Sequence, residues 1–372
     1  MFIAADVDLA QSDGQGVHVI SLSRAFAEIG EAVRLLVSRT SQTVPFQAKV
    51  EMRAIPNVGF PAFVAALRQV RDFRPDLIYE RRFSPKLGAA LSLATGVPYY
   101  LEINGLPETE QPAAVDGRTP RRRNPPKTMY RVARQIFVPS QRLANLLAGR
   151  LHLPPTRFTV VPNAADLSLF RPTEKAQARR VLGLSLESAI VVYIGNLAHW
   201  QGLETLVDAA KHLTQIPRLQ ILIVGDGPVR GSVIERIASA HVEGTIRLMG
   251  ALPHEKVPLV LSAADVCVAP FTRVRNDLIG ISPIKLFEYM AAGRPVVASD
   301  VAGVREIMQD AGMLVTPDSP TNLAAAISHL LSNPSKQDEL GRRASEISQL
   351  NSWEDRARTI LSVVSGQPVS AS

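Results

Sequence analysis

Short apolar runs alternate with helical runs along almost the whole chain, and this alternation limits the fold more than any other feature of the sequence. Such alternation is typical of βαβ units, in which crossover helices connect parallel strands. In the first half of the chain, the predicted strands and helices occupy residues 1–7, 17–29, 32–37, 61–73, 76–79, 85–95, 98–103, 135–139, 140–149 and 159–161. We therefore expect a doubly wound α/β domain with a parallel sheet.

An irregular stretch, VPNAADLSLFRP at residues 161–172, interrupts the alternation. Its prolines, asparagine and aspartate are typical of turns. The alternation then restarts, and the predicted elements occupy residues 190–194, 203–213, 220–224, 229–240, 246–249, 256–263, 266–270, 284–292, 295–299, 323–331, 336–347 and 352–364. The sequence thus predicts two α/β domains that meet at this stretch and turn their strand ends toward a cleft.

Composition is compatible with two ordinary soluble domains. The chain has 372 residues, of which 46% are apolar, so a large core can form. Its single cysteine, Cys267, lies in an apolar run, where a core position is more common than a nucleophile. The first ten residues lack the basic and apolar regions of a signal peptide, and no run approaches the ~18 apolar residues of a membrane span. We expect a cytoplasmic protein.

The chain is basic, with a formal net charge of +7, which allows nucleic acid, a phosphorylated substrate or an anionic membrane as partner. Aromatic residues make up only 5% of the chain, which argues against a nucleic-acid module. Within residues 111–127, basic side chains cluster at Arg118, Arg121, Arg122, Arg123 and Lys127. This stretch is expected to be either a solvated loop or a peripheral contact with the anionic inner membrane leaflet.

The stretch at residues 280–307 combines a helix start with two charged side chains. Ser282 is a good N-cap, Pro283 a good first helical residue, and Gly293 a good helix end. Lys285 would add a full positive charge to the first turn, and Glu288 would share its helix face. A cation for phosphate beside a carboxylate for sugar hydroxyls suggests a nucleotide-sugar site. The alternative is an ordinary capped helix with an i,i+3 ion pair.

Polar residues follow two predicted strands of the first half. Glu80 and Arg81 follow residues 76–79, while Glu102 and Asn104 end or follow residues 98–103. Ligands of open parallel sheets bind beyond the carboxyl ends of the strands, so these side chains are placed where a site is expected. A surface salt bridge of Arg81 is the alternative.

The first predicted helix follows a glycine turn at residues 13–16. The turn could approach a phosphate or could simply connect strand and helix. His18 at the helix start could contact a ligand or face solvent.

Six segments, taken in order, resemble the family 4 retaining glycosyltransferases, also called glycosyl transferases group 1. They are LEINGLPETE, VPNAADLSLFRP, YIGNLAHWQGLETLVDA, ILIVGDGP, SPIKLFEYMAAGRPVVAS with AGVREI, and NSWEDRA. The resemblance covers nearly the whole chain and implies the GT-B fold, in which two Rossmann-like domains face a central cleft and a C-terminal helix crosses back to the first domain. Residues 1–165 with 352–366 would form the acceptor domain, and residues 172–350 the nucleotide-sugar donor domain.

The resemblance implies transfer of a sugar, with retention, from a nucleoside diphosphate sugar to a glycan, glycolipid or other acceptor, without metal or cofactor. Glu288 would hold the ribose hydroxyls and Lys285 would neutralise the departing phosphate, with Glu102 as the third catalytic candidate. Acceptor contacts would come from His18, Arg81, Glu102 and Asn104. Donor contacts would come from Gly16, Gly195, Asn196, Gln201, Gly202, Gly280, Ile281, Ser282, Pro283, Lys285 and Glu288, including the backbone amides of Ile281 and Ser282.

The sequence departs from the family pattern in three respects. Gly280 stands where a glutamate is usual, and Asn196 and Gln201 stand where the phosphate loop usually has an arginine and a lysine. Glu102 or Asn104 replaces a frequent histidine. Lys285 would take over part of the missing positive charge. Glu102 would contact acceptor hydroxyls or accept a proton, or else be a structural carboxylate paired with Arg81.

These departures leave a second hypothesis open, a catalytically weak partner subunit that binds nucleotide sugars or glycans. A GT-B nucleotide-sugar epimerase ranks lower, because no acid/base set lies near residues 161–172 and SPIKLFEYM is atypical of that group. The SPxKLFEYM motif, together with Trp200, instead resembles a variant subgroup of the transferases.

Overall fold

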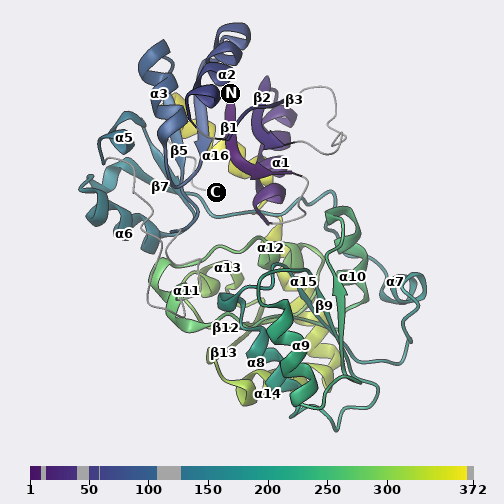
Figure 1. The fold of residues 1–372 in the computed structure, drawn as a ribbon. Coiled ribbons are helices and arrows are strands. Elements are labelled where there is room, and N and C mark those ends of the chain that lie inside the picture. Colours follow the sequence, from purple (N-terminus) through teal and green to yellow (C-terminus); the bar gives the residue numbers. More distant parts are fainter. Residues whose placement is uncertain (10–13, 40–49, 58, 107–126, 367–372) are drawn as a thin grey trace. The chain divides into compact units, whose positions relative to one another are not determined.

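The computed structural model describes all residues except 10–13, 40–49, 58, 107–126 and 367–372 (Figure 1). The chain divides into two compact units. The first contains Met1–Gln11, Gln15–Pro162 and Trp353–Ser372, and the second contains Ser12–Gly14 and Asn163–Ser352. The irregular stretch from Asn163 onward thus belongs to the second unit.

The first unit is built on a parallel sheet that, in the described residues, has seven strands in the order β3-β2-β1-β4-β5-β6-β7. The strand order reverses between β1 and β4, the kind of switch point at which open parallel sheets bind ligands. The strands are β1 (Phe2–Asp8), β2 (Val33–Arg39), β3 (Val50–Ala54), β4 (Ile78–Arg81), β5 (Tyr99–Glu102), β6 (Ile136–Val138) and β7 (Phe158–Val160).

Helices connect these strands, and the C-terminal helix α16 joins the same unit. In Figure 1 the yellow α16 lies among the purple and blue elements of this unit. Local signals set several ends: the Ser140 hydroxyl caps α6 by accepting from the Leu143 amide, and Gly96 ends α3 in a left-handed conformation. The helices are α1 (Gly14–Glu28), α2 (Gly59–Phe73), α3 (Lys86–Thr95), α5 (Lys127–Val132), α6 (Gln141–Leu151) and α16 (Trp353–Ser365), with a 3₁₀ turn η1 (Pro155–Arg157).

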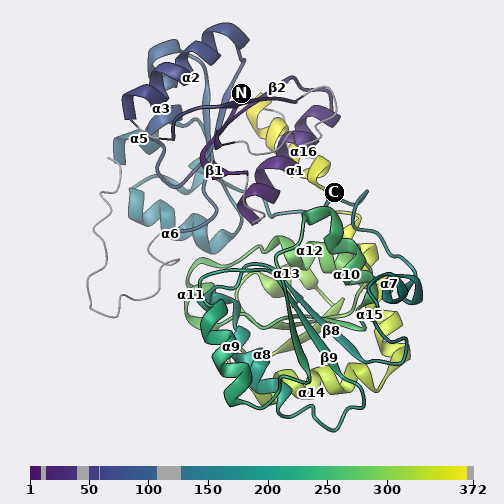
Figure 2. The same cartoon turned by 45° about the vertical axis from the view of Figure 1, so that its right-hand side comes forward.

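The second unit has a parallel sheet of six strands in the order β10-β9-β8-β11-β12-β13, with its reversal between β8 and β11. Every residue of β8 is buried, as expected for a strand covered on both faces. Figure 2 shows α8, α9 and α14 together beside β8 and β9, where their apolar side chains form the main core. The strands are β8 (Ile190–Ile194), β9 (Gln220–Val224), β10 (Ile246–Gly250), β11 (Val266–Ala269), β12 (Val296–Ser299) and β13 (Gly312–Val315).

Nine α-helices and two 3₁₀ turns within the described residues surround this sheet. They are α7 (Lys175–Val181), α8 (Leu203–Ala210), α9 (Arg230–Ser239), α10 (Val257–Ala263), α11 (Arg273–Ile279), α12 (Ile284–Ala291), α13 (Val304–Met308), α14 (Pro320–Leu331), α15 (Pro334–Ser348), η2 (His199–Gln201) and η3 (His254–Lys256).

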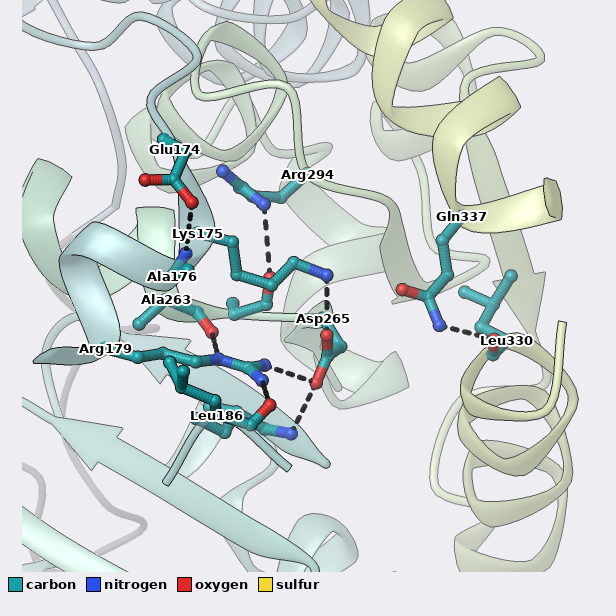
Figure 3. Close-up of polar contacts among 12 residues, drawn as sticks. Glu174, Lys175, Ala176, Arg179, Leu186, Ala263, Asp265, Arg294, Leu330 and Gln337 are labelled. Carbon is teal, nitrogen blue, oxygen red and sulfur yellow. Dashed lines mark hydrogen bonds and ion pairs between the residues drawn. The ribbon is translucent and has the colours of Figure 1, made fainter. Parts of the chain in front are cut away.

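A half-buried aspartate, Asp265, fastens α7 to the sheet (Figure 3). The Asp265 carboxylate accepts hydrogen bonds from Lys175 Nζ at 2.7 Å, from Arg179 Nη2 at 2.7 Å and from the Ile190 amide at 2.8 Å. Only 5% of the Arg179 side chain is exposed, so Asp265 is its charge partner in a largely water-free place. This cluster holds the segment after the irregular stretch to the first strand of the sheet.

Two local predictions at helix starts are wrong. Helix α1 begins at Gly14, so Gly16 lies buried in its first turn rather than in a preceding glycine turn. Ser282 is not the N-cap of α12, because Pro283 holds that position and no side chain caps the helix. Gly293 follows the helix with a φ of 64°, which agrees with its predicted role as a stop.

Two predictions concern membranes. Among the described residues, no helix combines the length and apolarity needed to cross a bilayer. The basic cluster from Arg118 to Lys127 lies outside the described residues, except for Lys127, which begins α5.

Candidate functional site

Helix α12 brings Lys285 and Glu288 to one face, as their spacing predicts. Leu286, Phe287 and Tyr289 of the same helix are almost fully buried, which fixes the helix against the sheet. The Tyr289 hydroxyl accepts from the Ile194 amide at 2.8 Å and so ties α12 to the end of β8. As at any helix start, the first amides of α12 have no intrahelical acceptor.

The Lys285 ammonium group is surrounded mainly by uncharged groups. Its Nζ donates to Gln201 Oε1 at 2.8 Å and lies 3.9 Å from the centre of the Tyr193 ring. The residue is only 8% exposed, and burial lowers the pKa of Lys285 well below its ordinary value, although nearby Glu288 raises it in part. The predicted positive charge of Lys285 thus has no carboxylate bonded to its Nζ, and burial opposes it. An anion at Nζ would restore the charge.

Gly195 makes room for this lysine. A Cβ built on Gly195 would lie 2.8 Å from Lys285 Nζ, and the φ of 134° is one that other residues rarely adopt. Gln201, predicted to replace a cation, instead accepts from Lys285 and lies 3.3 Å from the Tyr193 hydroxyl. That hydroxyl also donates to the Asn196 carbonyl at 2.8 Å. Gly195, Asn196 and Gln201, which lie in the segment that resembles the family's phosphate loop, thus surround Lys285 of helix α12 with uncharged groups.

Glu288 has a partner that the sequence did not suggest. Its Oε1 lies 2.7 Å from Nε2 of His254 in η3, and no described residue bonds to its other oxygen. The ring of His254 rests against Phe170, with centroids 5.1 Å apart. Burial lowers the pKa of His254, but Glu288, with smaller contributions from Asp166 and Glu255, raises it more. Neither alternative for Glu288 included this contact, because no local pattern links residues 34 positions apart.

The segment before α12 is tied to the irregular stretch of the same unit. The Asn163 amide donates to the Ser282 hydroxyl at 2.8 Å, and Asn163 Nδ2 donates to the Ser282 carbonyl at 2.5 Å. The Ile281 amide donates to the Ala302 carbonyl at 2.8 Å. The predicted phosphate contact of the Ile281 amide is therefore wrong for this arrangement. The amides of Ser282, Ile284 and Lys285 stay candidates, whereas the Leu286 amide donates to the Pro283 carbonyl at 3.1 Å.

Gly280 has a backbone conformation that explains why glutamate is missing there. It ends α11 with a φ of 60° and a ψ of 137°, which an L-residue rarely adopts. Its amide donates to the Asn276 carbonyl at 2.9 Å. The Asn276 side chain is fully buried and donates to the carbonyls of Trp200 and Thr272 at 2.9 and 2.7 Å. The glycine therefore belongs to the geometry that connects α11 with the phosphate loop.

In the first unit, Glu102 lies at the centre of a buried polar cluster rather than at a surface. Its Oε1 is 2.8 Å from His18 Nε2 and accepts from Arg356 Nη2 at 2.9 Å, while its Oε2 accepts from the Tyr79 hydroxyl at 2.6 Å. Burial raises the pKa of Glu102, but Arg356 and His18 together hold it well below the ordinary range. The side chain is 0% exposed. This placement contradicts its predicted roles as acceptor contact and proton acceptor. It agrees with the alternative of a structural carboxylate, except that the partner is Arg356 instead of Arg81.

His18 belongs to the same cluster, which contradicts both an acceptor contact and a solvent-facing position. Its side chain is 1% exposed and packs edge-on against the Trp353 ring, with centroids 5.1 Å apart. Burial lowers the pKa of His18 to about 4, so the ring is neutral near pH 7. Helix α16 thus covers the strand ends with Trp353 and Arg356.

Arg81 and Asn104 remain the acceptor candidates of the first unit. Both are half-buried, and among the described residues Arg81 Nε and both polar atoms of the Asn104 amide have no hydrogen-bond partner. Glu80 is instead buried and accepts from the Tyr99 hydroxyl at 2.7 Å and the Gly88 amide at 3.1 Å. Burial raises the pKa of Glu80 to about 7.

A cavity of about 270 Å³ lies at the start of α8. Gly202, Glu204, Asp208 and Arg236 are among the residues that line it, whereas Lys285 and Glu288 do not. Of the predicted donor residues, the cavity contacts only Gly202, so it is separate from the Lys285–Glu288 face. In the part of the chain that the structure describes, no group of three or more His, Cys, Asp or Glu side chains is arranged to hold a metal ion.

Comparison with known families gives two matches that together cover most of the chain. The family described as Glycosyltransferase Family 4 matches residues 12–169, and the family described as Glycosyl transferases group 1 matches residues 188–333. A D-inositol 3-phosphate glycosyltransferase of Acidothermus cellulolyticus is 25% identical over 94% of this chain and 85% of its own. An alpha-D-kanosaminyltransferase of Streptomyces kanamyceticus is 29% identical over 56% of this chain and 52% of its own.

Solved structures share the fold. Sucrose-phosphate synthase of Thermosynechococcus elongatus has a TM-score of 0.76 at 24% identity and covers 98% of both chains. Anabaena HepE in complex with UDP-glucose has a TM-score of 0.76 at 18% identity and also covers 98% of both chains. The predicted GT-B fold is thereby confirmed.

Proposed function

This chain belongs to the group 1 glycosyltransferases of family 4, and we propose that Lys285 and Glu288 hold the diphosphate and the ribose of its nucleoside diphosphate sugar donor. One observation carries the proposal. The two side chains share a face of α12 but do not bond to each other: Lys285 donates to the uncharged Gln201, and Glu288 contacts the titratable His254. An ordinary i,i+3 ion pair would leave neither group for a ligand.

At the phosphate end, the chemistry requires a group that responds to growing negative charge. The diphosphate is the leaving group, so charge accumulates on it as the bond to the sugar breaks. Lys285 and the free amides at the start of α12 would meet that charge in a place with little water, where such interactions are strong. Gln201 and the Tyr193 ring hold the ammonium without neutralising it.

At the ribose end, Glu288 keeps one oxygen for hydroxyl groups. A carboxylate offers about four acceptor positions, and His254 occupies one of them on Oε1. Two neighbouring hydroxyls of a ribose can donate to the remaining positions. The residue is only 6% exposed, which would strengthen these bonds by excluding water.

The acceptor would bind to the first unit, at the carboxyl ends of β4 and β5. Arg81 and Asn104 offer polar atoms that the described residues leave unpaired, and both suit hydroxyl or phosphate groups. The acceptor would be a glycan, a glycolipid or another hydroxylated molecule, and transfer would retain the anomeric configuration. HepE of Anabaena was solved with UDP-glucose, which supports the same class of donor here.

We also propose a peripheral contact between the basic cluster at residues 118–127 and an anionic membrane. Clustered Lys and Arg side chains near an anionic surface contribute about 1 kcal/mol each. Vesicles of anionic lipid should therefore sediment the protein at low salt and release it at high salt. Cosedimentation that is absent at low salt would refute the contact.

Transfer and hydrolysis assays with UDP-, GDP- and ADP-sugars test the function. Lys285→Met should lower kcat/KM by roughly 10²–10³-fold, as when one group that stabilises the transition state is removed. Glu288→Gln should lower it by roughly 10–100-fold. A matched control is the surface pair Lys336 and Glu339, also three residues apart on one helix, whose Met and Gln variants should be neutral.

Turnover that survives in the Lys285 and Glu288 variants would refute the site. Nucleotide binding without turnover by the unmodified protein on any tested donor would indicate the partner-subunit hypothesis instead. That the reaction needs no metal ion stays a prediction. It is tested by adding excess EDTA, which should leave turnover unchanged.

A further inference from the structure

We propose that His254 fixes the position of the Glu288 carboxylate, so that His254 is a positioning residue for recognition of the donor ribose. The inference rests on the proposed role of Glu288 and adds a residue that neither its position in the sequence nor its exposure would single out. It follows from three features of the second unit: the contact itself, the support behind the imidazole ring, and the charges around it.

The contact restricts a flexible side chain. A glutamate has three side-chain torsions, and ordering such a chain on binding costs roughly 0.5–1.5 kcal/mol. His254 Nε2 lies 2.7 Å from Glu288 Oε1, so part of this ordering is already achieved before a ligand arrives. The bond uses Oε1 and leaves Oε2 without a partner among the described residues.

The imidazole ring is itself held from behind. Phe170 is 1% exposed and meets the ring with centroids 5.1 Å apart. The Phe170 amide donates to the Asp166 carbonyl at 2.8 Å, which fixes the backbone that carries the supporting ring. His254 begins the 3₁₀ turn η3, which the bond from the Lys256 amide to the Pro253 carbonyl closes at 2.9 Å, so its own backbone is held as well. A chain of contacts thus runs from Phe170 through His254 to Glu288.

The surrounding charges favour a histidine that donates to the carboxylate. Acidic groups face His254 from three segments: Glu288 on α12, Asp166 in the stretch before α7, and Glu255 in η3 itself. All three favour the protonated ring, against the opposing effect of burial. A protonated ring has a hydrogen on Nε2, and a neutral ring can carry one there too. The histidine can therefore hold Glu288 on both sides of its own titration.

The test compares a ribonucleotide with its 2′-deoxy counterpart on the full-length protein. UDP, GDP and ADP are first compared by calorimetry, and the tightest is used with its 2′-deoxy form. The unmodified protein should bind the ribonucleotide roughly tenfold more tightly, as expected for one hydrogen bond to a charged group. His254→Phe keeps the ring against Phe170 but loses Nε2, and it should reduce this preference to about twofold or less.

His254→Gln retains a donor of similar reach and should keep more of the preference than His254→Phe. His212→Gln, at an exposed histidine after α8, is the control and should behave like the unmodified protein. In the transfer reaction, His254→Phe should raise the KM for the donor while kcat changes little, because ribose binding is equal in the ground and transition states.

The outcomes separate this inference from the proposed function. If Glu288→Gln abolishes the ribose preference and His254→Phe leaves it intact, the role of His254 is refuted and that of Glu288 stands. If Glu288→Gln leaves the preference intact, the ribose role of Glu288 is refuted, and this inference with it. Equal weakening of both nucleotides in His254→Phe would indicate a merely structural residue. Tighter ribonucleotide binding in His254→Phe would show that His254 competes with the ribose, which also refutes the inference.

Discussion

Binding of a nucleoside diphosphate should draw a proton from solution onto Lys285. Burial among Gln201, Tyr193 and Phe271 lowers the pKa of Lys285 well below its ordinary value, so the free protein holds the amine largely uncharged over part of the alkaline range. A diphosphate at Nζ favours the ammonium form. The two events are therefore linked, and the affinity must depend on pH.

The size of the linkage follows from simple electrostatics. One negative charge 4 Å from the ammonium contributes about 4 kcal/mol at an effective dielectric constant of ~20, which corresponds to a pKa increase of about three units. Between the lowered pKa of the free protein and the higher pKa of the complex, each pH unit costs about 1.4 kcal/mol of binding. The affinity should thus fall by up to about tenfold per pH unit as the pH rises.

Calorimetry in two buffers with different ionisation enthalpies measures the proton directly. The slope of the binding enthalpy against buffer enthalpy should approach one proton taken up at pH values that lie between the pKa of Lys285 in the free protein and its pKa in the complex. Lys285→Met should bind more weakly and take up no proton. Proton uptake that is absent at every pH would refute the reasoning. Proton uptake that is equal in Lys285→Met would also refute it and would place the titrating group elsewhere, for example at His254.

The same substitution should stabilise the free protein. The pKa of Lys285 is lower in the folded state, so the unfolded chain binds more protons and folding stability increases with pH up to the ordinary lysine value. Lys285→Met removes this penalty, and its thermal midpoint near pH 7 should exceed that of the unmodified protein. A lower midpoint would mean that the lysine contributes more through its contacts than it costs through burial.

Three further predictions concern stability. Acid should destabilise the first unit. Burial lowers the pKa of His18 from 6.5 to about 4, so the unfolded chain is protonated first and the free energy of unfolding falls by about 3 kcal/mol between those pH values; Glu102 adds a loss in the same direction at lower pH. Circular dichroism that shows no such acid transition would contradict the assignment. Glu102→Gln should lower the free energy of unfolding by roughly 3–5 kcal/mol in urea titrations, because Arg356 would stay buried without its carboxylate. Asp265→Asn should cost a similar amount by the same measurement, through the buried Arg179, and a cost under about 1 kcal/mol would show that water reaches it.

The sequence predicted the fold where strong local patterns exist. The residues predicted for β8 and β9 match the observed strands from end to end, because each is a continuous apolar run bounded by turn residues. Short elements without such a pattern were missed, among them α7, α11 and β13. Helix α7 depends on Asp265, some ninety positions away in the chain, and no local signal can reveal such a partner.

The candidate site was predictable in position but not in its contacts. Helical spacing correctly placed Lys285 and Glu288 on one face, since that depends only on neighbours in the chain. Their partners come from residues 84 and 34 positions away, and the alternative of a mutual i,i+3 ion pair is not what the structure shows. The predicted ligand role of Glu102 was wrong for the same reason. Its carboxylate is bonded by Arg356, which lies 254 positions later in the sequence, so no local pattern could show that this strand end is covered.

The departures at Gln201 and Gly280 form one consistent arrangement. A lysine at position 201 would add a second amine close to the buried Lys285, and the like charge would disfavour the protonated form of both. The neutral amide oxygen of Gln201 instead accepts from Lys285. Gly280, in turn, has a backbone conformation closed to glutamate and is bonded to Asn276, whose side chain holds the Trp200 carbonyl beside Gln201. If Lys285 binds the diphosphate as proposed, the cation of the site lies on helix α12 instead of in this loop.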